Sequence, residues 1–278
     1  MLTQDILVRR PDGFQFGYNH ITEIGKEKLP TGMTFGVIKL RAGESYNLTS
    51  DLESAYLLMT GRIRFSYDDQ QYDAERTCYY SEVPIVLHCT PNTVAKVDAK
   101  THCEIMVIQT ANDKRFISQV FDASNMLESD KRGKGLLGDS SYRLVRTVFD
   151  KRNRKESNLV VGEIITFPGH WSSSPSHTHP HPEIYHYRFS EPQGYGIGEN
   201  GEDIIRIRHY DTMIITDDVE HAHSTAPGYC LYTLWFIRHL SGNPYIVPTF
   251  KPEHSWAKEE SANARVWKLC EGKSNEHN

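Results

Sequence analysis

Short apolar runs separated by polar turns recur along most of the chain, and this pattern constrains the fold more strongly than any other feature of the sequence. In the first half the runs begin after Met33 and are rich in β-branched and aromatic residues, at 34–40, 54–61, 62–67, 83–87 and 103–108. Short strands with turn signals between them are typical of β-barrels and β-sandwiches. The sequence therefore predicts an all-β fold.

The same layout returns in the second half of the 278-residue chain. Gly36 and Gly43 lie in a strand that runs into a turn, and Gly162 and Gly169 repeat their spacing. Repetition on this scale indicates a tandem duplication, so we expect two β-barrels. The expected boundaries are an N-terminal barrel at 1–125, a short and partly helical connector at 126–155, a C-terminal barrel at 156–250, and a tail at 251–278 with about its last eight residues disordered.

A histidine-rich stretch at 176–187 distinguishes the second half from the first. In an extended backbone His177 and His179 point to the same side, and Glu183 follows after a turn that contains two prolines. The segment of the first half that ends at Glu53 is shorter and has no histidine. We therefore expect the first barrel to be metal-free and structural, and the second to carry the chemistry.

A distant strand offers the remaining ligand of a metal site. The apolar run after Asp211 ends in an acidic turn, which is followed by His221 and His223, two histidines that would share one strand face. Three imidazoles and a carboxylate suit a divalent first-row metal and leave coordination positions open for water or substrate. His181, between two prolines, is better explained as an exposed loop histidine than as a ligand.

These residues carry a resemblance to a known fold family. The pattern His177-x-His179-x3-Glu183, followed by Asp211-x9-His221, resembles the two motifs of the cupin barrel. The second spacing favours the first histidine of the later pair as the fourth ligand. The resemblance implies a bicupin of two jelly-roll-like barrels with one metal per chain, zinc being the first choice and manganese, iron and nickel the alternatives.

A narrower resemblance covers most of the chain and is densest between residues 140 and 240. The runs at 143–146, 185–189, 192–195 and 226–232 resemble the 5-deoxy-glucuronate isomerases of myo-inositol breakdown, which are related to the uronate ketol-isomerases of pectin breakdown. The sequence departs from the cupin motif at Gly169, where the first glycine is displaced, and at Ser190, which replaces the last glycine.

The narrower resemblance implies a metal-dependent aldose–ketose isomerase that converts 5-deoxy-D-glucuronate to 5-dehydro-2-deoxy-D-gluconate. Three alternatives stay open. The first is an isomerase for the 4-deoxy-5-ketouronate of pectin breakdown. The second is a cupin dioxygenase, which would use Fe(II) at the same ligands and depend on oxygen. The third is a non-catalytic sugar-binding module, which is disfavoured because one half keeps a complete ligand set.

An isomerase also needs a general base within hydrogen-bond reach of its substrate. The candidates are Glu183 if it releases the metal, His223 and Tyr185, and the sequence does not separate them. Tyr187 shares a strand face with Glu183 and Tyr185, so it is expected to contact substrate hydroxyls; an ordinary core position explains it equally well. Gln193 could place a donor at the barrel mouth, although a turn accounts for it as well.

A sugar-acid substrate requires a cation, and arginine offers a bidentate fork to a carboxylate. Arg206 and Arg208 share one face of a predicted strand and are the preferred candidates, with Arg143 and Arg146 beside them.

Composition excludes several other classes of protein. The net charge of −5, from 31 Lys and Arg against 36 Asp and Glu, gives no basic footprint for nucleic acid. The five cysteines include no CxxC pair, which favours a reduced cytoplasmic protein without disulfides. No signal peptide or membrane span is apparent. Exposed strand edges favour a homo-oligomer.

Overall fold

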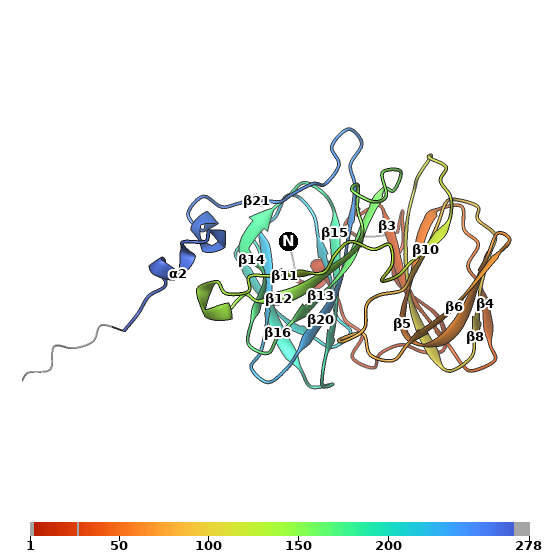
Figure 1. Ribbon diagram of the computed structural model, residues 1–278, viewed down its shortest axis with the longest axis horizontal. Helices are drawn as coiled ribbons and strands as arrows, with labels where there is room; N and C mark the ends of the chain where they lie inside the picture. The colour runs from red at the N-terminus through yellow and green to blue at the C-terminus, as the bar shows by residue number, and fades with distance from the viewer. Residues whose placement is uncertain (1–2, 27, 270–278) are drawn as a thin grey trace, which may run out of the picture.

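The computed structural model describes residues 3–26 and 28–269, and nearly all of its regular structure is β-strand (Figure 1). The helices in this part of the chain are short: α1 (Thr3–Ile6), η1 (Leu137–Asp139), η2 (Ser255–Lys258) and α2 (Ala262–Arg265). The predicted all-β class is confirmed. The strands form three sheets, and within the described residues none of the three closes into a barrel.

A nine-stranded sheet is built entirely from the first half of the chain. Its strands are β2 (Gly17–Thr22), β3 (Met33–Leu40), β4 (Ser45–Asn47), β5 (Glu53–Tyr67), β6 (Gln70–Arg76), β7 (Val86–Cys89), β8 (Ala95–Ala99), β9 (Cys103–Thr110) and β10 (Gln119–Phe121). β5 merges the two strands predicted at 54–61 and 62–67. It changes partners near Gly61, whose φ of 109° permits a sharp bend there.

The second half forms two further sheets. The seven-stranded sheet has the order β1 (Leu7–Val8), β18 (Thr212–Ile215), β15 (Glu183–Phe189), β20 (Leu231–Arg238), β13 (Leu159–Thr166), β12 (Arg143–Phe149) and β11 (Asp130–Arg132). The five-stranded sheet has the order β17 (Asp203–Arg208), β16 (Tyr195–Asn200), β19 (His221–Thr225), β14 (Trp171–Thr178) and β21 (Thr249–Phe250).

The seven-stranded sheet lies between the other two sheets, and its strands β13 and β15 are buried on both faces. Residues such as Ile184 and Phe236 pack with Phe35 of the nine-stranded sheet, which forms the core between the two halves. On the opposite face, Tyr187 packs with Ile207 of the five-stranded sheet. Because side chains alternate along a strand, Glu183 of β15 faces the five-stranded sheet, as Tyr187 does.

Two segments differ from the expected boundaries. The sequence predicts that residues 3–8 belong to the N-terminal barrel, but β1 pairs antiparallel with β18 of the second half. Much of the predicted connector at 126–155 is part of a sheet, because β11 and β12 extend the seven-stranded sheet and only η1 is helical. The end that is predicted to be disordered, about the last eight residues, lies outside the described residues.

Candidate metal centre

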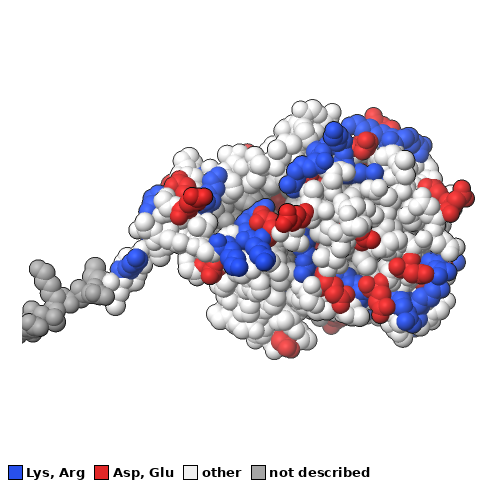
Figure 2. Space-filling model, viewed as in Figure 1, with Lys and Arg blue, Asp and Glu red and all other residues white. Residues whose placement is uncertain are grey.

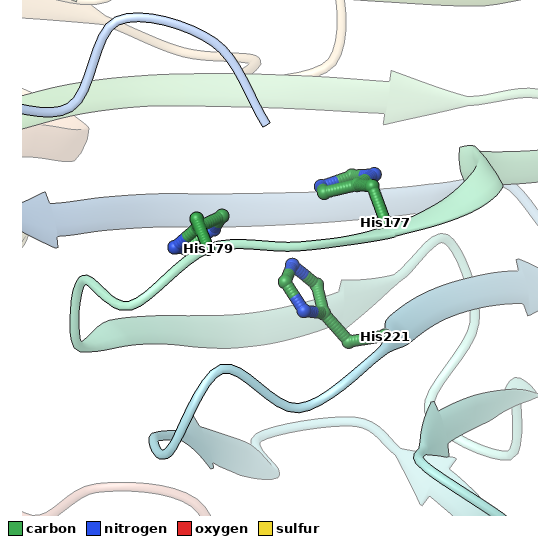
Figure 3. Close-up of side chains that lie close together, drawn as sticks. All are labelled: His177, His179 and His221. Atoms are coloured by element: carbon green, nitrogen blue, oxygen red, sulfur yellow. The ribbon is translucent and has the colours of Figure 1, made fainter. Parts of the chain in front are cut away.

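Three histidines converge between the two sheets of the second half (Figure 3). His177 lies on β14, His179 directly follows that strand, and His221 opens β19. His177 and His221 are paired across the two strands, which brings their imidazoles together. One ligand nitrogen from each of the three residues lies within 4.8 Å of the others, and all three side chains are buried.

The orientation of each imidazole is fixed by the backbone. In every case Nδ1 faces a carbonyl oxygen, at 3.4 Å for His177 and Pro175, 3.0 Å for His179 and His181, and 2.9 Å for His221 and Val219. A proton on Nδ1 that is donated to a carbonyl leaves Nε2 with a free lone pair, as in metal-binding histidines. This arrangement of Nδ1 against a carbonyl oxygen suits the tautomer that a metal requires, with the lone pair on Nε2.

Glu183 completes the set from the opposite sheet. Its Oε2 atom lies 2.9 Å from Nε2 of His179 and 3.3 Å from Nε2 of His221. Burial raises the pKa of Glu183, but its contacts with the two histidines outweigh that effect and lower it, so the carboxylate is ionised. Three nitrogens and one carboxylate oxygen fit a divalent first-row metal.

His221 also supports this fit. Its Nε2 atom is buried and makes no well-aligned hydrogen bond with the described residues. Buried polar atoms normally have a partner, and a metal ion would provide one here.

The other two histidines near the cluster occupy different positions. His223 lies farther along β19, where its ring packs 5.0 Å from that of Tyr185 and its Nε2 lies 3.3 Å from Oγ1 of Thr233. Burial lowers its pKa to about 3, so it is neutral. The prediction of an exposed His181 is wrong, because this side chain is only 5% exposed and its Nε2 lies 2.8 Å from the carbonyl oxygen of Asn243.

A cavity of about 530 Å³ opens beside the cluster and is lined by His177, Glu183 and Tyr185. One wall is a bulge in β14, where five residue steps from Ser172 to His177 oppose two steps on β19. Basic groups outnumber acidic ones in the lining, with Lys131, Arg132, Lys134, Arg143, Arg152 and Lys258 against Asp130, Asp150 and Glu183. Figure 2 shows basic and acidic side chains gathered on the face that carries β11.

The two tyrosines of β15 differ in their access to this cavity. Tyr185 lines it, and its hydroxyl lies 3.1 Å from Oγ of Ser173. Burial raises the pKa of Tyr185 well above its ordinary value, so the phenol stays protonated. Tyr187 is fully buried, and its hydroxyl contacts the sulfur of Met213 at 3.6 Å. The prediction that Tyr187 contacts the substrate is therefore wrong. Tyr187 occupies an ordinary core position, which was the alternative interpretation.

Two predicted arginines lie away from the cavity. On β17 the buried residues are Ile205 and Ile207, so Arg206 and Arg208 face outward and are exposed. Arg206 stacks on the ring of Tyr195 at 4.0 Å. The preference for these arginines as the carboxylate clamp is wrong, because alternation shows which residues share a face but not which face points inward.

Gln193 also lies away from the metal cluster, contrary to the prediction. It is exposed in the turn after β15, whereas Glu183 begins that strand. Seven strand residues separate the two ends by about 20 Å. Arg146 lies elsewhere as well, because its guanidinium donates to the carbonyl oxygens of Tyr80 and Glu82. Arg143 alone of the four arginines lines the cavity.

Sequence reasoning missed Tyr245. Its ring packs edge-on against His179 at 4.9 Å and His181 at 5.5 Å, and it lines the cavity. The available signal was the apolar run at 245–247 in an otherwise polar segment.

Across residues 3–26 and 28–269, no helix combines the length and apolar character needed to cross a membrane.

Comparisons with known proteins agree with this geometry. Similar relatives are 5-deoxy-glucuronate isomerases from Lacticaseibacillus casei, 22% identical over 79% of this chain and 85% of the relative, and Geobacillus kaustophilus, 26% identical over 83% and 87%. The crystal structure of an IolB-like protein from Salmonella typhimurium LT2 has a TM-score of 0.81 at 21% identity, covering 91% of this chain and 99% of its own.

The fold is shared more widely. A Bacillus subtilis oxalate decarboxylase has a TM-score of 0.61 at 10% identity, over 88% of this chain and 79% of its own. The model of the KduI/IolB family matches residues 7–257, which is most of the sequence. The chain therefore belongs to the KduI/IolB family.

Proposed function

We propose that this protein is a metal-dependent aldose–ketose isomerase of a uronate, and that it converts 5-deoxy-D-glucuronate to 5-dehydro-2-deoxy-D-gluconate in myo-inositol breakdown. The observation that carries the proposal is the set of three histidine nitrogens and the Glu183 carboxylate at the wall of a cavity with mainly basic charges. The names of the relatives support the reaction and the substrate.

The proposal includes the finer architecture and setting of the protein. Each half would form one jelly-roll-like barrel of a bicupin, with a structural first half and a catalytic second half. Among residues 3–26 and 28–269, the first-half sheet contains no strand from the second half, which supports this division. We further propose a cytoplasmic homo-oligomer that acts on a small sugar acid and has neither a nucleic acid nor a membrane as partner.

His177, His179, Glu183 and His221 would hold the ion, with zinc as the first choice. When bound, a divalent metal polarises a sugar carbonyl and acidifies the neighbouring hydroxyl. Because Tyr185 lines the cavity and is protonated, its hydroxyl would donate a hydrogen bond to a substrate oxygen.

The proton that moves between C1 and C2 needs a base in the cavity. Glu183 is ionised and lines the cavity, so once it releases the ion it would suit this role better than the protonated Tyr185. His223 packs beyond Tyr185 and is not part of the cavity lining. We therefore place Glu183 first among the three predicted candidates.

The test combines metal analysis of the purified protein with an anaerobic isomerase assay on 5-deoxy-D-glucuronate, D-glucuronate and the pectin-derived ketouronate. About one metal per chain and turnover of the first substrate are expected. Turnover of the ketouronate alone would move the substrate assignment to pectin breakdown. Activity that required oxygen would replace the isomerase with a dioxygenase.

A further inference from the structure

Arg143 of β12 is a buried arginine without an acidic partner. Arg143 is only 5% exposed. No carboxylate in the described part of the chain lies within ion-pair distance of its guanidinium. Burial lowers its pKa to about 10, so the guanidinium is still charged at neutral pH. A buried charge without a counter-ion is costly, which calls for a functional explanation.

Two other buried arginines of this chain have an acidic partner. Arg76 makes a bidentate pair with Glu163 at 2.7 and 2.8 Å, and Arg188 contacts Glu104 at 2.5 Å. Both of these arginines lie between the two halves of the molecule, where a permanent partner is available. Arg143 instead lines the cavity beside the metal cluster.

The hydrogen bonds of Arg143 leave one edge of the guanidinium available. Nη1 donates to the carbonyl oxygen of Ser141 at 2.7 Å, which fixes the group in place. Nη2 makes only a long contact of 3.4 Å with the carbonyl oxygen of Ser174, and Nε is buried with no partner. Nε and Nη2 form the side-on edge of a guanidinium, which matches the two oxygens of a carboxylate.

We propose that Arg143 binds the carboxylate of the sugar acid through Nε and Nη2, while the carbonyl end of the same molecule faces the histidine cluster. The assignment of the carbonyl end rests on the proposed function. Arg143 is then the residue that selects a sugar acid over a neutral sugar, because a neutral ligand would leave the buried charge unpaired.

The test measures the affinity of the metal-loaded protein for D-glucuronate and D-glucose by calorimetry. The two sugars differ only at C6, which carries a carboxylate in one and a hydroxymethyl group in the other. The wild-type protein is expected to prefer glucuronate by roughly 10- to 100-fold, as for a buried charged hydrogen bond. Arg143→Met should remove this preference and raise the KM for a uronate, and Arg143→Lys should retain part of it.

Arg208→Met is the matched control, because it removes an arginine from the outer face of β17 and should leave the preference unchanged. Metal content and Tm distinguish binding from a structural role. Since Arg143 has no acidic partner, Arg143→Met should keep its metal and change Tm by less than about 4 °C. A large loss of Tm with equal weakening of both sugars would overturn the proposal, as would an unchanged preference for glucuronate.

The inference and the proposed function can fail separately. If the wild-type protein isomerises no uronate but Arg143→Met still abolishes the preference for glucuronate, the isomerase proposal fails and the carboxylate site stands. If the protein is an isomerase and Arg143→Met leaves the KM unchanged, the carboxylate site is wrong and the isomerase proposal stands.

Discussion

At the scale of single residues, short-range spacing carried most of the information about the metal cluster. His177 and His179 are two residues apart on one strand, so their common direction follows from backbone geometry. The structure brings both together with Glu183 and His221, all four of which were predicted as ligands. The prediction that Arg206 binds the substrate carboxylate is wrong, because the sequence around Arg206 does not reveal which face of its strand is buried.

The assignment of His221 leads to a first prediction. His221→Ala should reduce bound metal from about one per chain to nearly none, because it removes one of three converging nitrogens. His223→Ala is the matched control on the same strand and should retain the metal, since its ring lies against Tyr185. Metal content after dialysis, measured by mass spectrometry, checks both. Loss of metal in the His223 variant alone would contradict the ligand assignment.

A second prediction concerns acid stability and His209. Burial, together with the charge of Arg188, lowers the pKa of His209 to about 4, and its Nδ1 accepts a hydrogen bond from the backbone N–H of Phe189 at 2.9 Å. Because the folded pKa lies below the ordinary value of about 6.5, folding favours the neutral ring. This contribution is complete above about pH 6.5 and is lost as the pH falls through 4.

Urea unfolding of the metal-free protein at pH 7 and pH 4.5 measures this loss. His209→Asn keeps an acceptor for the backbone N–H of Phe189 but does not titrate. The free energy of unfolding of the wild-type protein should fall by about 1–2 kcal/mol more than that of the variant, after allowance for partial exposure of the ring. Equal losses in the two proteins would show that His209 is not responsible.

At the scale of elements, the repeated glycines have matching structural roles in the two halves. A Cβ at Gly36 would lie 2.5 Å from the hydroxyl of Tyr18, and one at Gly162 would lie 2.7 Å from the indole of Trp235. Gly43 and Gly169 both have positive φ, at 85° and 79°. The first glycine of each pair admits an aromatic ring and the second forms a left-handed turn.

Other elements could not be read from local sequence. Apolar and polar residues alternate too little in the run at 143–149 to predict a strand. The run nevertheless pairs along β13 as strand β12 of the seven-stranded sheet. Likewise, the pairing of Leu7 with Met213 joins residues more than 200 positions apart. Long-range pairing of this kind depends on the assembled sheet and leaves no signature in a short window.

The glycine contacts give a third prediction. Gly162→Ala should lower the free energy of unfolding by about 1–3 kcal/mol, because its Cβ would overlap the ring system of Trp235. Trp235 also lines the cavity, so affinity for a sugar acid should fall as well. Gly36→Ala should also be destabilising, because its Cβ would overlap the ring of Tyr18, but it should leave the affinity for a sugar acid unchanged, because Tyr18 does not line this cavity. Urea unfolding and ligand titration of both variants check this; an equal loss of affinity in the two variants would contradict it.

At the scale of the whole molecule, a buried ion pair connects the two halves of the chain. Arg76 of β6 lies in the nine-stranded sheet, and its bidentate partner Glu163 lies on β13 in the seven-stranded sheet. Tyr232 of β20 donates a third hydrogen bond to the same carboxylate at 2.7 Å, and Arg146 lies 3.7 Å from it. None of this network could be anticipated, because its members are separated by most of the chain.

The last prediction follows from the complete burial of this pair, whose side chains are 0% exposed. Glu163→Gln should lower the free energy of unfolding by about 3–5 kcal/mol, because it leaves the Arg76 charge buried without a counter-ion. The double variant Arg76→Leu with Glu163→Leu should recover most of that loss, since apolar groups in place of a buried pair are often nearly neutral.

The experiment is a double-mutant cycle by urea unfolding, followed by two probes, one aromatic residue in each half. If the pair couples the halves, the two probes should report coincident unfolding transitions in the wild-type protein and separate transitions in Glu163→Gln. The variant loses the polar contact between the halves, whereas each half keeps its own apolar cluster. Coincident transitions with a loss below about 1 kcal/mol would mean that the apolar core between the sheets alone holds the halves together.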